Sequence, residues 1–285
     1  MKNRIKSDKK TGYTERILVP VSNPVHVNEL MDLAFYFHSH SELAIYPLTI
    51  LNKIAGDEES MGIANALLEK AAQSPVPDNV HIEPVIASDI NVAAGISKVV
   101  DQKNIDSTII GWNRDPVKGS RIFSTILDQL LVVTSQFLIV SNTSKSILEH
   151  QRIVMAIPPE SHREPGFEEL ISKTLNMAAS AKLDLLILTE YSQASRIKRS
   201  VENHGAELPV IVESVTLWED LNLVLQNRVR KGDVILLNGA RKETISWTHH
   251  SDQLPGSVSE QFPDNSLIVV YPRIKNRKFN SYFDP

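Results

Sequence analysis

Short apolar runs alternate with amphipathic segments along the first half of the chain. Five runs rich in β-branched and aliphatic residues predict strands, at residues 17–21, 43–51, 80–87, 107–110 and 137–140. Between them, apolar residues recur every three or four positions and predict four helices, at residues 30–37, 63–72, 93–100 and 122–131. Strands and helices that alternate in this way form a parallel sheet with helices on both faces. The pattern therefore predicts a doubly wound α/β fold.

The same order of elements begins again near residue 151. The segment QRIVMAI (151–157) is similar to ERILVPV (15–21), and prolines follow both segments. Further strands are predicted at 185–188, 209–212, 234–237 and 267–270, and helices at 170–179, 191–203 and 217–229. Repetition over about 135 residues, which is within the usual size of one domain, indicates a tandem duplication. We therefore expect two tandem doubly wound five-stranded parallel sheets, packed as a pseudo-twofold pair.

The polar run at residues 142–151 is the predicted boundary between the two copies. It places the first domain at residues 16–145 and the second at 151–273, followed by a tail at 274–285. Residues 1–15 form a leader with five Lys and Arg side chains and no apolar periodicity, a composition typical of disordered segments. A basic segment that lies near an anionic membrane surface is the alternative interpretation.

Composition argues against several classes of protein. The net charge of −4 and the pI of about 6.1 disfavour nucleic-acid binding. The chain has no cysteine, so it can form neither disulfides nor thiolate metal sites. No apolar run reaches the roughly 18 residues of a membrane-spanning helix, and no apolar signal-peptide core follows Met1. We expect a cytoplasmic location.

The richest candidate chemistry follows the predicted strand at 107–110. Gly111 comes directly after that strand, and a polar loop beyond it leads to an amphipathic segment near Ser124 and Thr125. Loops between a strand and a helix N-terminus hold phosphates in α/β sheets, because free backbone N–H groups and the helix dipole point at the ligand. This loop is therefore the predicted ligand site. Helix capping alone is the alternative role for Ser124 and Thr125.

The spacing of this loop resembles the universal stress protein signature G-x2-G-x9-G-[ST]. Gly111 stands at the first glycine and Thr125 at the closing hydroxyl, whereas Arg114 replaces the second glycine and Ser124 the third. The resemblance extends over residues 16–272 and implies two universal stress protein-like domains of the adenine nucleotide alpha hydrolase-like type. Both glycines that would let the backbone approach a triphosphate are missing, so the resemblance implies a nucleotide-binding frame with an altered phosphate cradle.

In ATP-binding members of that family, an Asp at the end of the first strand contacts the nucleoside. Ser22 replaces it here and offers a hydroxyl without charge. Arg114 can take a phosphate by a bidentate contact, which suits AMP or a cyclic dinucleotide better than ATP. An exposed Arg114 on a domain without a ligand is the alternative, and Trp112 either stacks on a base or covers the sheet edge. The predicted site comprises Ser22, Asn23, Gly111, Asn113, Arg114, Ser124 and Thr125.

Two further segments resemble a narrower group of proteins. ERILVPVSNP (15–24), after a Lys-rich leader, and FPDNSLIVVYP (262–272) are similar to the cytoplasmic C-terminal region of bacterial monovalent cation/proton antiporters, which ends in two such domains. This resemblance implies a regulatory region fused to, or adjacent to, a membrane antiporter domain, and we expect a homodimer. A free-standing tandem universal stress protein that binds ATP and a ligand-free dimerisation scaffold are the alternatives.

The remaining candidate chemistry is sparse. In the second copy, Gly239 has no second glycine near it, and the pair Gly256-Ser257 lies four residues beyond the expected closing position, so we expect no nucleotide there. His249 and His250 are interpreted as part of a solvated loop, because no third ligand has the spacing of a metal site. No G-x-S-x-G, Walker or HExxH motif occurs in the sequence. We therefore predict no enzymatic activity.

Overall fold

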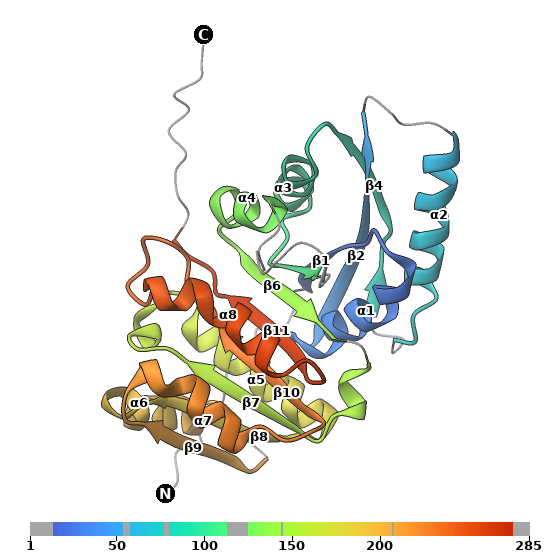
Figure 1. Cartoon of the computed structure of the whole chain (residues 1–285). Helices are drawn as coiled ribbons and strands as arrows, with labels where there is room; N and C mark the ends of the chain where they lie inside the picture. The colour runs from blue at the N-terminus through green and yellow to red at the C-terminus, as the bar shows by residue number, and fades with distance from the viewer. Residues whose placement is uncertain are drawn as a thin grey trace, which may run out of the picture.

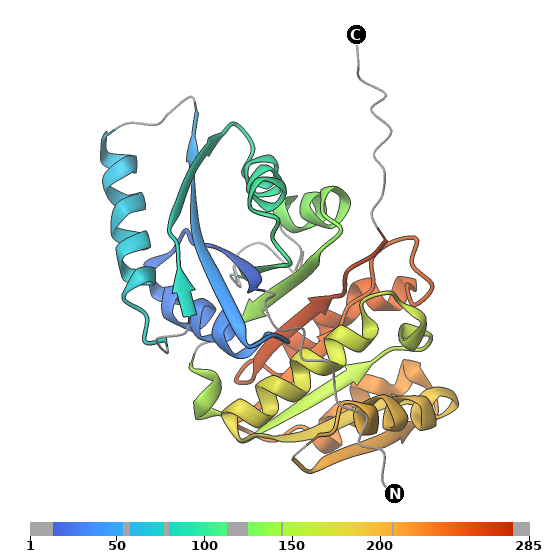
Figure 2. The same cartoon turned by 180° about the vertical axis from the view of Figure 1, so that it is seen from behind.

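The computed structural model describes residues 14–53, 58–76, 80–112, 125–143, 145–206 and 208–275. Within this part of the chain, the strands form one sheet of eleven strands with helices on both of its faces (Figures 1 and 2). The first half of the chain builds one end of the sheet and the second half builds the other. The α/β class predicted from the sequence is confirmed.

The two halves contain the following elements. The first half has β1 (Thr14–Pro20), α1 (Val27–Tyr36), β2 (Glu42–Asn52), α2 (Glu58–Ala72), β3 (Val80–Ile82), β4 (Val85–Asp89), α3 (Val92–Lys103), β5 (Ser107–Gly111), α4 (Thr125–Val133) and β6 (Phe137–Asn142). The second half has β7 (Arg152–Ile157), α5 (Phe167–Ala181), β8 (Asp184–Glu190), α6 (Tyr191–Asn203), β9 (Val210–Val215), α7 (Leu221–Arg228), β10 (Asp233–Asn238), α8 (His249–Gln261) and β11 (Ser266–Tyr271). Each predicted element has a counterpart, and α8 is a helix that the periodicity did not predict.

The strand order within each half is 3-2-1-4-5. It runs β3-β2-β1-β5-β6 in the first half and β9-β8-β7-β10-β11 in the second, and β4 also pairs with β2. The pairs inside each half are parallel. The strands with the most continuous apolar runs, β1, β5, β6, β7, β10 and β11, lie in the interior of the sheet and are buried.

The two predicted sheets are continuous rather than separate. Strand β6 pairs with β11 in antiparallel orientation, from Asn142 opposite Leu267 to Leu138 opposite Tyr271. Each half thus contributes its fifth strand to the joint. Because the two equivalent strands pair in antiparallel orientation, the halves are related by an approximate twofold axis, as in an isologous dimer.

The third strand differs from its prediction. Residues 80–87 were expected to form one strand, but the structure divides them into β3 and β4 at Pro84. The register with β2 is the same on both sides of the break, so Pro84 comes opposite Pro47. Neither proline has an N–H to donate, and the hydrogen-bonded ladder is interrupted without a shift of register.

In the part of the chain that the structure describes, four helices cover each face of the sheet. Helices α1, α2, α5 and α6 pack on one face, where their apolar side chains form a core with alternate strand residues. Helices α3, α4, α7 and α8 pack on the other face around a second core. Both cores extend across the β6–β11 joint, since each contains residues of both halves.

A buried ion pair ties the start of β1 to the second half. The carboxylate of Glu15 accepts hydrogen bonds from Lys173 Nζ of α5 and, at 2.8 Å, from the backbone N–H of Ser39. Both charged side chains are almost completely buried, and the Lys173 ammonium lies 5.4 Å from the centroid of the Phe137 ring. Burial alone would raise the pKa of Glu15, but Lys173 and Ser39 outweigh it and hold that pKa below its ordinary value.

The predicted leader is therefore wrong at its end. Thr14 and Glu15 belong to β1, because the carboxylate of Glu15 has a cationic partner inside the protein. Residues 1–13 and 276–285 lie outside the described residues. The domain limits at 16–145 and 151–273 stay a prediction.

The connection between the halves is packed against α1. Asp32 accepts hydrogen bonds from the backbone N–H of Ile147 at 2.7 Å and from Ser146 Oγ at 2.9 Å. A short 3-10 helix (Ile147–Glu149) starts at this point with a capping box between Ser146 and Glu149. The polar run that marks the boundary in the sequence is therefore anchored to the first half.

Candidate ligand-binding cavity

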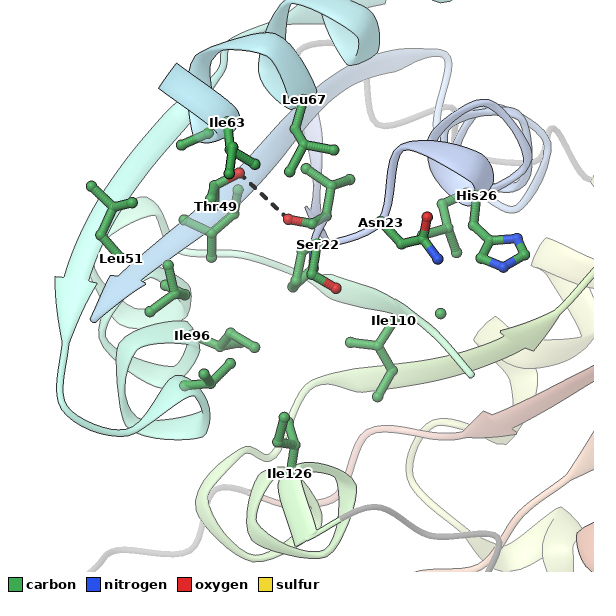
Figure 3. A pocket seen from close by; sticks show the side chains of 18 of the residues that line it. Ser22, Asn23, His26, Thr49, Leu51, Ile63, Leu67, Ile96, Ile110 and Ile126 are labelled. Carbon is green, nitrogen blue, oxygen red and sulfur yellow. Dashed lines mark hydrogen bonds between the residues drawn. The ribbon is translucent and has the colours of Figure 1, made fainter. Parts of the chain in front are cut away.

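A cavity of about 390 Å³ opens at the carboxyl ends of β1, β2 and β5 (Figure 3). The strand order changes direction between β1 and β5, and open α/β sheets bind ligands at such a switch point. The volume lies within the range of small-molecule sites. The cavity lies at the edge of the sheet where the sequence predicts the ligand of the first half.

The wall of the cavity is mostly aliphatic. Apolar side chains come from the strand ends and from all four helices of the first half, namely Leu30, Leu48, Ile50, Leu51, Ile63, Ala64, Leu67, Val92, Ile96, Ile110 and Ile126. Polar side chains come from the region of β1, β2 and the first turns after them, namely Ser22, Asn23, His26, Thr49, Asn52 and Ser60. Among the described residues that line the cavity, none is Asp, Glu, Lys or Arg. The described wall thus suits the apolar part of a ligand.

The turn after β1 is fixed by its own residues. The side chain of Asn23 accepts a hydrogen bond from Val25 N at 2.9 Å and caps a short 3-10 helix (Pro24–His26). Pro24 is compatible with this first turn because its missing N–H has no partner there in any case. Thr49 Oγ1 donates to the carbonyl oxygen of Val21 at 3.4 Å (Figure 3), which holds the ends of β1 and β2 together beside the cavity.

The opposite wall is held by Asn91, the residue before α3. Its side-chain oxygen accepts from Ala94 N at 3.2 Å and caps α3, while its Nδ2 donates to Gln129 Oε1 of α4 at 3.1 Å. This contact links α3 to α4 where each carries an apolar side chain of the wall, Val92 and Ile126. Asn91 therefore joins the two helices that form this wall.

Three of the predicted site residues line the cavity together. These are Ser22, Asn23 and Gly111. Thr125 is the first residue of α4, next to Ile126 in the wall. Asn113, Arg114 and Ser124 lie outside the described residues, so their part of the site stays a prediction.

Gly111 also has a packing reason to be glycine. A Cβ atom at this position would lie 3.3 Å from Cδ1 of Leu30, so a larger residue would have to displace that side chain. Trp112, the next residue, packs half-buried against the core on the face of α3 and α4, and its backbone N–H donates to Ser141 O at 2.8 Å. This packing favours the interpretation of Trp112 as a cover of the sheet over that of a base-stacking residue.

Sequence reasoning missed the contribution of β2. The end of this strand, from Leu48 to Asn52, supplies five of the lining residues, although the predicted site included none of them. The signal was available, because parallel neighbours end at the same edge of a sheet. The aliphatic wall was harder to foresee, since core and cavity side chains follow the same periodicity.

In the second half, side chains fill the corresponding place. Gln193 of α6 is buried, and its Nε2 donates to Pro158 O and to Thr189 Oγ1, each at 2.7 Å. Its Oε1 forms a 2.9 Å hydrogen bond with His162. These contacts occupy the ends of β7 and β8, and the absence of a nucleotide from the second copy stays a prediction.

Neither Gly239 nor Gly256 of the second half belongs to a phosphate-binding loop of the expected form. A Cβ atom on Gly239 would lie 2.7 Å from the ring of Tyr271, so the chain passes too close for any side chain. Gly256 and Ser257 lie inside α8, and the alternative that they close a phosphate loop is wrong. His249 and His250 begin α8 after the capping residue Thr248, so the interpretation of a solvated loop is wrong as well.

Two further searches of the described residues bear on function. No group of three or more His, Asp or Glu side chains is placed to hold a metal ion. No described helix has the length and apolar content that crossing a bilayer requires.

Two copies of a 3-2-1-4-5 parallel sheet, joined by their fifth strands, define a tandem universal stress protein (UspA-like) fold. A universal stress protein from Archaeoglobus fulgidus shares it with a TM-score of 0.55 and 12% identity, over 92% of this chain and 97% of that one. The cytoplasmic domain of a prokaryotic cation chloride cotransporter has a TM-score of 0.55 and 11% identity, over 91% and 96% of the two chains. At these identities the likeness concerns the fold alone.

One curated protein gives a sequence similarity. It is the Na(+)/H(+) antiporter NhaS5 of Synechocystis sp., 25% identical over 124 residues. The match covers 41% of this chain and 18% of the antiporter's length. No protein-family profile matches the chain. The resemblance to universal stress proteins is confirmed for the fold, and an antiporter is among the similar proteins.

Proposed function

We propose that this chain is a regulatory region of a membrane cation/proton antiporter, on the cytoplasmic side, and that its first half binds a small adenine nucleotide. The cavity at the ends of β1, β2 and β5 carries the proposal. The cotransporter and antiporter similarities support the link to ion transport, since both relatives are named as ion-transporting proteins. The other half contributes packing and no second nucleotide site.

An adenine nucleotide suits the chemistry of the cavity. The aliphatic wall accommodates a flat base, while Ser22, Asn23 and Thr49 offer neutral hydrogen-bonding groups for a base or ribose. The phosphate is proposed to meet Arg114 and the start of α4, on the sequence prediction for that loop. AMP or a cyclic dinucleotide is preferred to ATP, because two glycines of the triphosphate cradle are replaced.

Calorimetric titration of AMP, ATP and a cyclic dinucleotide into the chain tests this proposal. Ala64→Leu should abolish binding, because Ala64 of α2 lines the cavity and the larger side chain would occupy its space. Gly62→Leu is the matched control. It introduces a leucine two residues away on the same helix, where an added Cβ atom would have no neighbour within 4 Å. Binding that survives Ala64→Leu would place the ligand elsewhere, and no binding of any nucleotide would favour the ligand-free scaffold.

Arg114→Ala tests the phosphate contact separately. Loss of one charge-assisted hydrogen bond costs about 1.5–3 kcal/mol, or roughly ten- to a hundredfold in affinity. Binding that is indifferent to Arg114 would contradict the proposed orientation of the nucleotide.

The proposal includes no catalysis. Without a positioned general base in the predicted site, we expect no ATP turnover above background in a steady-state phosphate-release assay. Turnover that disappears in Arg114→Ala would contradict this part.

The antiporter link and the homodimer need different measurements. The reading frame in the genome should contain about a dozen apolar segments of roughly 20 residues, the length that spans a bilayer. A separate gene for this chain alone would favour the free-standing stress protein. In sedimentation, a homodimer would have about twice the chain mass of 31.9 kDa.

A further inference from the structure

Arg241 lies in the loop after β10, which in the second half takes the place of the glycine loop after β5. Its side chain is almost completely buried, with 2% of its surface exposed. The loop starts at Gly239, against the ring of Tyr271. Its position after the fourth strand of the second half makes it the counterpart of the predicted phosphate loop.

The guanidinium of Arg241 contacts the first half. Nη1 donates to the carbonyl oxygens of Leu131 at 3.0 Å and Thr134 at 2.7 Å, and Nη2 donates to that of Gln136 at 2.6 Å. These carbonyls belong to the last turn of α4 and to the residues directly after it. The backbone N–H of Ile274, also from the second half, donates to the carbonyl of Ser135 at 2.9 Å.

Arg241 contacts the C-terminus of α4, where Leu130 O already accepts from Thr134 N at 2.9 Å and from Thr134 Oγ1 at 2.6 Å. The last four carbonyls of a helix lack partners within it, and a positive charge near them is favourable because of the helix dipole. The last turn of α4 contains no basic residue of its own. Arg241 adds a hydrogen bond to Leu131 O, two more to the residues just after the helix, and a positive charge, all from the other half of the chain.

The other end of α4 borders the cavity. Ile126, in its first turn, is part of the wall, and Gln129 makes the contact with Asn91 that joins α4 to α3. The helix has nine residues, so a rise of about 1.5 Å per residue separates the two ends by roughly 13 Å. A change at the C-terminus of so short a helix moves the wall of the cavity with it.

We propose that Arg241 is a positioning residue through which the second half sets the wall of the cavity in the first half. The loop after β10 corresponds to the predicted phosphate loop of the first half, but it contacts α4 and not a ligand. This coupling makes the conformation of the second half and the ligand affinity of the first half interdependent. The part concerning affinity rests on the proposed function, whereas the part concerning α4 stands without it.

Hydrogen exchange of the full chain tests the positioning of α4. In Arg241→Met, amides of α4 should exchange at least tenfold faster than in the wild type, while those of α3 keep their rates. Arg241→Lys should give an intermediate rate, because an ammonium keeps the charge without the planar fork of donors. Arg228→Met is the control, since Arg228 pairs with Glu213 on the surface of the second half.

A core variant separates positioning from general loss of stability. Leu225→Ala creates a cavity under α7 in the second half, where Leu225 is fully buried. At equal loss of stability, Arg241→Met should weaken AMP binding about tenfold and Leu225→Ala should leave it unchanged. Equal exchange of α4 in both variants would overturn the proposal, and Arg241→Lys decides if Arg241→Met does not fold. If the wild type binds no AMP, the proposed function fails, and the exchange of α4 alone decides the positioning role.

Discussion

The two halves of this chain share a fold but differ at the same edge of the sheet. A threonine on the second strand of each half donates to the end of the first strand, Thr49 to Val21 O at 3.4 Å and Thr189 to Ile157 O at 3.2 Å. Beyond this shared bond, the first half has a cavity and the second has the buried side chain of Gln193. The two halves share the frame of strands, and the difference lies in what covers the strand ends.

The helix after the second strand meets the strand ends differently in the two halves. In the second half, β8 ends at Glu190 and α6 begins at the next residue. Gln193, in the first turn of α6, therefore reaches the carbonyl oxygens of Ile157 and Pro158. In the first half, the described part of α2 starts at Glu58 and lines the cavity with Ser60, Ile63 and Ala64.

The second half, in which Gln193 covers the strand ends, also anchors the first half, which has the cavity. Lys173 of α5 pairs with Glu15 at the start of β1, and Arg241 holds the C-terminus of α4. Helix α1 is the counterpart of α5 in the first half, and its buried face carries aliphatic side chains such as Leu33. The comparison teaches that two copies of one fold can differ at the same edge, one with a cavity there and the other with contacts that stabilise its neighbour.

The largest expected effect comes from breaking the anchor at β1. Lys173→Met leaves Glu15 buried without its partner, which should cost about 3–5 kcal/mol in the free energy of unfolding. Chemical denaturation measures this cost. The double variant Glu15→Met/Lys173→Met is the control and should regain most of the stability, because an apolar pair of similar volume often replaces a buried ion pair without loss. A loss below 1 kcal/mol for the single variant would show that the halves do not depend on this pair.

The next effect concerns the closed edge of the second half. Gln193→Ala removes the donor to Pro158 O and Thr189 Oγ1, which should destabilise the fold by about 1–3 kcal/mol in urea unfolding. Gln253→Ala, in an exposed part of α8, is the control and should change little. We expect Gln193→Ala to bind no nucleotide in the second half, because the loops there pack on Tyr271 and Glu164. If Gln193→Ala binds a nucleotide at the strand ends of the second half, Gln193 alone accounts for the difference between the halves and this expectation is wrong.

Much of the fold could be predicted because its signals are local. The apolar runs of β1, β5, β6, β7, β10 and β11 are buried on both faces of a parallel sheet, and such strands are continuous apolar segments in any sequence. The β6–β11 joint could not be read in this way, since the register between two distant strands leaves no periodic trace. Helix α8 was missed because Pro255 and Gly256 lie inside it and are typical of turns.

The candidate site was predictable only in part. Ser22, Asn23 and Gly111 stand at strand ends, so the topology brings them together once the strands are assigned. Gln193 gave no such signal, because a glutamine in a charged helical segment is usually exposed. Its burial depends on the immediate passage from β8 to α6. The sequence predicts the start of this helix at residue 191 but ends the strand at residue 188, so the immediate passage was not foreseen.

A smaller effect is expected from returning an acid to the open edge. Ser22→Asp places a carboxylate where ATP-binding stress proteins carry an Asp, and a charge-assisted bond to a ribose is about 1 kcal/mol stronger than a neutral one. Affinity for AMP in calorimetric titration should therefore rise roughly fivefold. Ser195→Asp adds the same charge at an exposed position of α6 and serves as the control. Unchanged or weaker binding would mean that Ser22 does not face the ribose.

The smallest effect is a pH dependence to which both halves contribute. Burial lowers the pKa of His38 in the first half, and burial likewise lowers the pKa of His150, whose ring nitrogens contact Gly232 O and Ser266 Oγ. An unfolded chain takes up these protons near the ordinary pKa of 6.5, whereas the folded chain resists them. The stability is therefore complete above that pH and falls as the pH drops through it.

Two carboxylates modify this dependence at lower pH. The pKa of Glu15 lies below its ordinary 4.5, so its contribution is lost only as the pH falls further. Burial raises the pKa of Asp32 above its ordinary 3.8, so Asp32 acts in the opposite direction and favours the folded state on acidification. Thermal unfolding at pH 7.5 and 5.5 should show a modest fall in the midpoint. In His150→Asn the midpoint should be lower at both values and the fall smaller, and a rise on acidification would mean that Asp32 outweighs both histidines.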